Sequence, residues 1–289
     1  MKVLVIGKSG QLGQSIKKLI DEKTTNYNFY FVARDQLDLE NLDSLHNYFE
    51  NNVFDILINC ASFNDVDKAE YDNELANRVN HIAVREIAKI AKKKNMKLIH
   101  ISTDYVFDGK KNKPYIETDN TSPLNYYGKS KLAGENAILS VMQSNAVILR
   151  TAWVYSEFGN NFVNTVLNLA SKNHSIDIVS DQFGTPTFAY DLAKVIISII
   201  HSDLFISKNM PSKLYNFSNE GECSWFDFGS EIVKISRMSC IVNPIKTIDY
   251  PLPAKRPKNS ILDKRLISEE FDLNIRHWKE SLKNCLENL

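Results

Sequence analysis

The chain has 289 residues, of which 35 are basic (Lys and Arg), 35 are acidic (Asp and Glu) and 43% are apolar. A net charge of zero excludes a protein that depends on a large positive charge to bind nucleic acid or an anionic membrane, and no apolar run in the sequence is as long as a membrane span. Four cysteines without a C-x-x-C pair argue against a zinc site or a disulfide framework and favour a reducing compartment: Cys60, Cys223, Cys240 and Cys285.

The N-terminal sequence MKVLVIGKSG runs directly into a strand-like apolar segment, which leaves no room for a signal peptide, so we expect a cytoplasmic protein. Apolar runs then alternate with helical patterns. Strands are predicted at 3–7, 29–33, 55–61, 97–102 and 146–151, and helices at 12–20, 43–52, 73–94 and around Tyr127. Continuous β-branched runs between helices are typical of the α/β class, here a Rossmann-like doubly wound parallel sheet with helices on both faces.

After about Trp153 the alternation loosens, and prolines gather between Pro244 and Pro257. We therefore predict two domains. Residues 1–152 form a Rossmann domain, completed by segments within about 165–205. Residues 153–289 form mainly a smaller, partly interleaved α/β domain that binds the substrate.

Three glycines, Gly7, Gly10 and Gly13, form a G-x-x-G-x-x-G array between the first strand and the first helix. Glycine tolerates positive φ and lets the backbone approach a pyrophosphate, while the N-terminus of the following helix presents free N–H groups. Because the array directly follows a buried strand, it favours a dinucleotide site over an ordinary tight turn.

The end of the second strand bears on the choice of cofactor. An acidic residue there binds the ribose 2′-hydroxyl and disfavours a 2′-phosphate. This strand ends at Ala33 and Arg34, with Asp35 one residue further on. Arg34 favours NADPH, and NADH is the alternative if Asp35 takes the acidic role.

Residues 124–135, LNYYGKSKLAGE, hold two adjacent tyrosines and two lysines. Side chains four residues apart share a helix face, so Tyr127 is paired with Lys131, whereas Tyr126 is paired with Ser130. Such a pair is also typical of a plain amphipathic helix. Reduction of a ketone by hydride leaves an alkoxide that must be protonated. We expect Tyr127 to donate this proton, and the Lys131 ammonium to lower the tyrosine pKa and hold the nicotinamide ribose.

Ser102 and Thr103 follow the strand at 97–102, at the carboxyl end of the sheet, where ligands bind in doubly wound folds. A hydroxyl there can simply cap the strand end in a local turn. Because Tyr127 and Lys131 begin the next helix, we expect Thr103 to orient the substrate carbonyl.

These segments resemble the extended short-chain dehydrogenases/reductases, and more narrowly the dTDP-4-dehydrorhamnose reductase family. The resemblance covers nearly the whole chain. It is carried by GKSGQLG at 7–13, NCASFNDVDKAE at 59–70, STDYVFDG at 102–109, ETDNTSPLNYYGKSKLAGE at 117–135, RTAWVY at 150–155, GNNF at 159–162, DQFGTPT at 181–187 and PAKRPKNSIL at 253–262.

The resemblance implies reduction of dTDP-4-dehydro-β-L-rhamnose to dTDP-L-rhamnose by NADPH or NADH, a step of polysaccharide biosynthesis. For the cofactor it implies, beside Arg34, the residues Gly7, Gly10, Gln11, Leu12, Gly13, Asp38, Leu39, Ala61, Ser62, Phe63, Asn64, Tyr127 and Lys131. For the nucleotide sugar it implies Thr103, Asp104, Trp153, Asn161, Phe162, Gln182 and Arg256. The arginine can pair bidentately with a diphosphate.

Two departures from the family pattern stand out. Some members form a dimer bridged by magnesium through two glutamates, and the matching positions here are Ser15 and Tyr190, neither of which magnesium prefers. We therefore predict no structural metal, and a monomer or a homodimer without a bridging metal. Cys60, Phe63 and Asn64 replace more usual small and polar residues beside the cofactor, which bears on substrate or cofactor preference.

Three alternatives stay open. The first is a reductase of a UDP-linked 4-keto-6-deoxy sugar, because the methyl group that distinguishes thymine from uracil is worth only about 1–3 kcal/mol. The second is a bifunctional 3,5-epimerase/4-reductase, for which His81 and His100, both in apolar patterns, are poor acid–base candidates. The third is a non-catalytic NADP-binding regulatory subunit of methionine adenosyltransferase.

Overall fold

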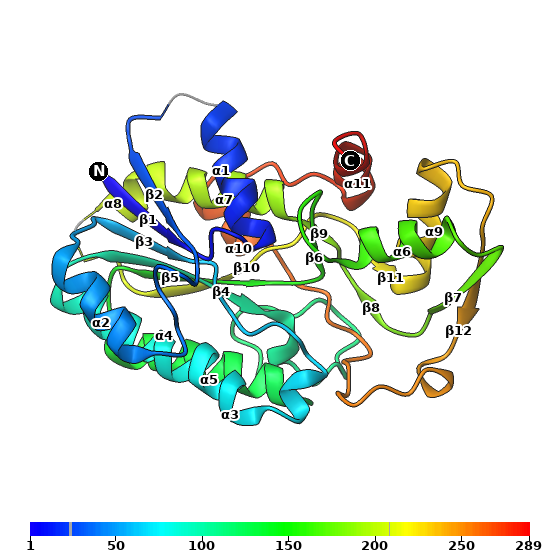
Figure 1. Cartoon of the computed structure of the whole chain (residues 1–289), viewed down its shortest axis with the longest axis horizontal. Helices are drawn as coiled ribbons and strands as arrows, with labels where there is room; N and C mark the ends of the chain where they lie inside the picture. The colour runs from blue at the N-terminus through cyan, green and yellow to red at the C-terminus, as the bar shows by residue number, and fades with distance from the viewer. Residues whose placement is uncertain (23–24, 208) are drawn as a thin grey trace.

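A computed structural model describes residues 1–22, 25–207 and 209–289 of the chain (Figure 1). A six-stranded sheet in the order β10-β5-β4-β3-β1-β2 forms its larger lobe, and every neighbouring pair of strands is parallel. The strands are β1 (Lys2–Ile6), β2 (Asn28–Val32), β3 (Ile56–Asn59), β4 (Lys97–Thr103), β5 (Ala146–Thr151) and β10 (Lys213–Asn216). The predicted Rossmann-like sheet is confirmed.

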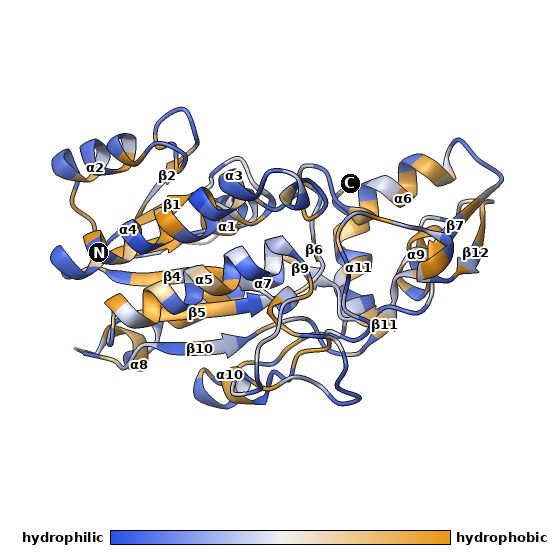
Figure 2. Cartoon of the chain, turned by 90° about the horizontal axis from the view of Figure 1, so that it is seen from below, coloured by the Kyte–Doolittle hydropathy of each residue, from blue (hydrophilic) through white to orange (hydrophobic). Residues whose placement is uncertain are grey.

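Helices cover both faces of this sheet, as Figure 1 shows. On one face lie α1 (Gln11–Glu22) and α7 (Ala189–His201), and on the other α2 (Leu42–Asn51), α4 (Ala83–Lys93) and α5 (Tyr126–Val141). Alternate residues of β1 divide between the two cores, with Val3 and Val5 facing α1 and α7, and Leu4 and Ile6 facing the opposite helices. Strands buried on both faces have continuous apolar sequences, and Figure 2 shows β1 and β5 coloured mostly as hydrophobic.

The single long helix predicted at 73–94 is interrupted. It begins as α3 (Asn73–Asn77), passes through a π-helical turn at Arg78–Ile82, and continues as α4. The turn carries the buried Asn80, whose side chain bonds both backbone groups of Phe63 at 2.9 Å. A polar contact of this kind inside a helix explains the extra residue in the turn.

A second, smaller lobe packs beside the carboxyl ends of the strands (Figure 1). Its strands pair as β6 (Val154–Tyr155) with β9 (Thr187–Phe188), β7 (Ser175–Val179) with β12 (Ile241–Ile245), and β8 (Phe183–Gly184) with β11 (Cys223–Ser224). Its helices are α6 (Phe162–Ala170), α9 (Trp225–Ile235) and α11 (Trp278–Leu286). Tyr155, Phe228 and Trp278 form the centre of its separate core.

The chain crosses between the lobes more than once. Helix α7, within the range 165–205, packs on α1 of the larger lobe, and the sheet takes its edge strand β10 from beyond that range. The division at residues 152 and 153 stays a prediction. The short helices α8 (Asp203–Ile206) and α10 (Arg265–Glu270) also belong to the larger lobe. None of the helices in the three described ranges is both long enough and apolar enough to cross a membrane.

Candidate active site

A cavity of about 600 Å³ lies at the carboxyl ends of β1 to β5 and continues to the junction with the second lobe. It includes the gap between β1 and β3, where the strand order reverses and where ligands bind in doubly wound folds. Most of the predicted site residues line it: Gly7, Gly10, Gln11, Leu12, Arg34, Asp38, Leu39, Ala61, Ser62, Phe63, Asn64, Thr103, Asp104, Tyr127, Lys131 and Trp153. Five do not: Gly13, Asn161, Phe162, Gln182 and Arg256.

The glycine turn after β1 is tight enough that side chains are excluded. Gly7 has φ of +95°, and a Cβ there would lie 2.9 Å from the Ala61 backbone nitrogen. A Cβ on Gly13 would lie 2.2 Å from the Gly7 carbonyl oxygen, so Gly13 lets the first turn of α1 pack on the loop although it does not face the cavity. The backbone and the helix N-terminus therefore offer the cradle that a dinucleotide diphosphate requires.

Arg34 lies at the rim of this cradle and is engaged by two carboxylates. Its Nε is 3.4 Å from Asp38 Oδ1, and its Nη2 donates to Glu40. Asp38 and Glu40 also line the cavity. The residue expected to favour a 2′-phosphate is therefore already in an ion pair.

Tyr127 and Lys131 project from the first turns of α5. Asn125 caps the helix by accepting from the Gly128 N–H at 2.8 Å, and a Cβ on Gly128 would lie 2.2 Å from the Tyr105 carbonyl oxygen. This close approach brings the helix onto the end of β4, where Lys131 Nζ donates to the Ile101 carbonyl at 2.6 Å. Tyr127, Lys131 and Thr103 thus all line the cavity, and the Tyr127 and Thr103 side chains are in hydrogen-bond contact.

The expected lowering of the Tyr127 pKa by Lys131 is wrong for this structure. Desolvation by the surrounding protein raises the Tyr127 pKa to about 12, although a hydrogen bond with Thr103 opposes the shift. Desolvation also lowers the Lys131 pKa to about 8, opposed by the charge of Glu135. Tyr127 therefore carries its proton at neutral pH, which is the form that a proton donor needs.

Asp104 lies beside Thr103 at the base of the cavity and is 2% exposed. Its Oδ1 accepts from Thr103 Oγ1 at 3.1 Å, whereas its Oδ2 has no hydrogen-bond partner among the described residues. Desolvation raises the Asp104 pKa to about 7, against the lowering effect of the nearby Ser260 and Thr103 hydroxyls. A buried oxygen without a partner is suited to a polar ligand group.

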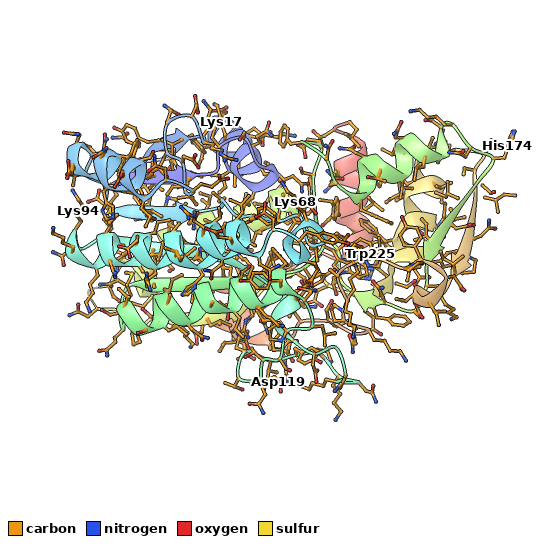
Figure 3. The ribbon with its side chains drawn as sticks, turned by 60° about the horizontal axis from the view of Figure 1, so that its bottom comes forward. Lys17, Lys68, Lys94, Asp119, His174 and Trp225 are labelled. Carbon is orange, nitrogen blue, oxygen red and sulfur yellow. The ribbon has the colours of Figure 1, made fainter. Side chains whose placement is uncertain are left out.

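Trp153 stacks face to face on Trp225, and both rings line the cavity. Figure 3 shows Trp225 where the two lobes meet. Phe162 lies behind Trp225, with ring centroids 4.6 Å apart, so it supports the aromatic wall without facing the cavity. Trp225 could not be predicted from the sequence, because it follows Trp153 by 72 residues and no local pattern connects the two.

The other predicted sugar-binding residues have protein partners. Arg256 forms a bidentate pair with Asp67, at 2.9 and 2.6 Å, which lowers the Asp67 pKa. Gln182 is buried and donates to Thr247 Oγ1 at 3.1 Å. Asn161 caps α6 through the Asn164 N–H at 3.2 Å.

A buried ion pair behind the site was also missed. Glu135 and Arg150 are 1% and 4% exposed, and Arg150 Nη2 donates to Glu135 Oε2 at 2.6 Å while its Nε donates to Oε1 at 2.9 Å. Glu135 also accepts from Ser102 Oγ at 2.5 Å. Helical spacing relates Glu135 only to Lys131, four residues earlier, and no local pattern relates it to Arg150, which lies 15 residues further on in β5.

Ser15 and Tyr190 lie on the packed helices α1 and α7. The buried Ser15 Oγ donates to the Gln11 carbonyl at 2.9 Å, and the Tyr190 hydroxyl donates to Glu22. Across the described ranges no three His, Cys, Asp or Glu residues gather as a metal site would require. Cys60 lines the cavity, and burial raises the pKa of its thiol to about 12.

Comparison with known proteins gives one consistent result. The RmlD substrate binding domain family matches residues 1–289. The chain is 38% identical to a dTDP-4-dehydrorhamnose reductase of Aggregatibacter actinomycetemcomitans, over 98% of this chain and 97% of that one. It is 35% identical to the spore coat polysaccharide biosynthesis protein SpsK of Bacillus subtilis, over 99% and 97%. The crystal structure of a Bacillus anthracis dTDP-4-dehydrorhamnose reductase in complex with NADP matches with a TM-score of 0.92 and 33% identity, over 100% of this chain and 99% of that one.

Proposed function

The chain belongs to the RmlD family, and we propose that it reduces the 4-keto group of dTDP-4-dehydro-β-L-rhamnose with NADPH to form dTDP-L-rhamnose. The observation that carries this proposal is that Tyr127, Lys131 and Thr103 line the same cavity as the glycine cradle. The relatives named as dTDP-4-dehydrorhamnose reductases support the choice of substrate.

The nicotinamide cofactor supplies the hydride when it is bound. The residues that fit its diphosphate are the backbone of Gly7, Gly10 and Gln11, with the N-terminus of α1 behind them. Ala61 and Ser62 line the middle of the same cavity. NADH is the alternative cofactor, because Arg34 is engaged in ion pairs with Asp38 and Glu40 and is less available to a 2′-phosphate.

The chain's own contribution to the reaction is to hold and move one proton. Thr103 positions the substrate carbonyl oxygen beside the Tyr127 hydroxyl. As negative charge develops on that oxygen, Tyr127 donates its proton to it, and Lys131, one turn further along the same helix, would hold the nicotinamide ribose. The raised pKa of the tyrosine keeps the proton in place until then, and an oxygen that becomes an alkoxide is basic enough to take it.

The sugar would lie between Asp104 and Trp153. Asp104 Oδ2, which has no partner among the residues that the structure describes, could accept from a sugar hydroxyl, and the Trp153 face offers an apolar surface to the ring. For Arg256 to reach a diphosphate, it must leave Asp67. The oligomeric state stays a prediction, as a monomer or a homodimer without a bridging metal.

The test is NADPH consumption with dTDP-4-keto-6-deoxyglucose, in the presence and absence of a separate 3,5-epimerase. We expect consumption only with the epimerase, because the proposed substrate is the epimerised sugar. Consumption without it would indicate built-in epimerisation or another product, which NMR of the product distinguishes. If the UDP-linked sugar is consumed faster than the dTDP-linked sugar, the nucleotide assignment is wrong. NADPH binding without turnover of any keto sugar would favour a regulatory subunit.

A further inference from the structure

The ion-pair cluster of Arg34, Asp38 and Glu40 lies where the ribose end of the cofactor is expected, in the segment that joins β2 to α2. Asp38 and Glu40 line the cavity there, together with Leu37 and Leu39, which are only 2% and 5% exposed.

The segment that carries the two carboxylates is held more firmly than the arginine side chain. Asp38 Oδ1 accepts from the Glu40 backbone N–H at 3.0 Å, and the Asp38 backbone N–H donates to Ser44 Oγ at 3.2 Å, so both bonds fix the backbone at these positions. The side chains of Asp38 and Glu40 are 33% and 30% exposed, against 68% for Arg34. Arg34 is therefore the partner that is free to turn, and Glu40 is one of the two groups that determine where it rests.

We propose that Glu40 is a cofactor-specificity residue, which weakens the preference for NADPH over NADH by competing with the 2′-phosphate for Arg34. This inference rests on the proposed function for its class of cofactor. A 2′-phosphate is recognised best by an arginine that is free to form two parallel hydrogen bonds with it. In this chain Arg34 must first leave Glu40, whereas a 2′-hydroxyl makes no such demand.

The test measures the affinities of the purified protein for NADPH and for NADH at equilibrium. Both are obtained by fluorescence titration in the absence of any sugar. Glu40→Gln keeps the size of the side chain and removes its charge. We expect NADPH to bind about fivefold more tightly to this variant, as is typical of an exposed ion pair, and NADH to change by less than about twofold. The gain in NADPH affinity should shrink in 0.5 M salt, because salt screens the interactions between exposed charges.

A matched control is Glu86→Gln, which removes a similar glutamate that pairs with Lys89 at 2.9 Å on α4 and does not line the cavity. It should change neither affinity. In an Arg34→Ala background, Glu40→Gln should no longer improve NADPH binding, because the competition acts through the arginine.

Three results would count against the inference in different ways. An unchanged ratio of the two affinities in Glu40→Gln overturns it and leaves the proposed function intact. A gain that persists in the Arg34→Ala background shows direct repulsion of the phosphate by Glu40, and overturns the competition for Arg34. If neither nucleotide binds the unmodified protein, the proposed function and this inference both fail.

Discussion

Trp153 and Trp225 stack with their ring centroids 3.5 Å apart and an angle of 11° between their planes. Trp153 follows β5 and has φ of +48°, a conformation that is unfavourable for a bulky side chain. The Trp153 ring also lies close to Gly184, where a Cβ would lie 2.7 Å from the indole ring. The second lobe thus holds Trp153 between an aromatic ring and a glycine, and fixes one wall of the cavity.

We predict that Trp225→Leu raises the KM for the nucleotide sugar about fivefold with a smaller change in kcat, because loss of the stack costs about 1 kcal/mol of positioning for Trp153. Trp225→Phe should retain most of the affinity, since it keeps a flat ring. Steady-state kinetics with both variants measures the split, and NADPH binding serves as the control. If kcat instead decreased about fivefold while KM stayed unchanged, Trp225 would act on the chemical step rather than on substrate binding.

Tyr127→Phe should lower kcat by about 10³-fold, because the alkoxide loses its proton donor while the ring still fills its place. The NADPH affinity and the urea midpoint of unfolding should change little. The adjacent Tyr126→Phe is the matched control, since Tyr126 does not line the cavity, and it should keep its activity. Substantial turnover by Tyr127→Phe would contradict the assignment of the donor.

The pH dependence of the free energy of unfolding should reveal the lowered pKa of the buried Lys131. Its pKa is about 8 in the folded protein, against an ordinary value of 10.5. Below pH 8 the folded protein bears the full cost of the buried charge. Between pH 8 and 10.5 the unfolded chain binds more protons than the folded one, so this contribution to the free energy of unfolding increases with pH, by about 3 kcal/mol in total.

Lys131→Met cannot show this increase. We therefore expect the stability of the variant relative to the original protein to decrease from pH 8 to pH 10, measured by urea unfolding of both proteins at each pH. Groups other than Lys131 titrate in both proteins and cancel in the difference. A difference that stays constant over this range would show that Lys131 is not desolvated as the structure indicates.

The Glu135–Arg150 pair should be costly to break. Glu135→Gln leaves a buried guanidinium without its counter-charge, so we expect a loss of about 3–5 kcal/mol in the free energy of unfolding. The exposed pair of Lys17 and Asp21, with atoms 2.7 Å apart, is the control, and Asp21→Asn should cost less than about 1 kcal/mol. Similar losses in the two variants would refute the distinction between buried and exposed pairs here.

Much of the architecture could be predicted from local sequence. The strands at 3–7 and 146–151 and the helix that carries Tyr127 were recognised because apolar periodicity reports which faces are buried. The glycine array could also be interpreted from local sequence, because its position between a strand and a helix determines the backbone conformation there. The helix at 73–94 was predicted without its π-helical turn, because Asn80 bonds a residue 17 positions away.

By itself, the sequence determined the order of strands and helices along the chain, the glycine turn between the first strand and the first helix, and the place of Tyr127 and Lys131 on one helix, because each depends on residues close together in the chain. Only the tertiary structure decided the direction of the Tyr127 pKa shift, the stacking of Trp225 on Trp153, and the pairing of Arg256 with Asp67. Desolvation depends on all the atoms packed around a group, and partners 72 or 189 residues apart are brought together only when the sheet and the second lobe have closed around the cavity.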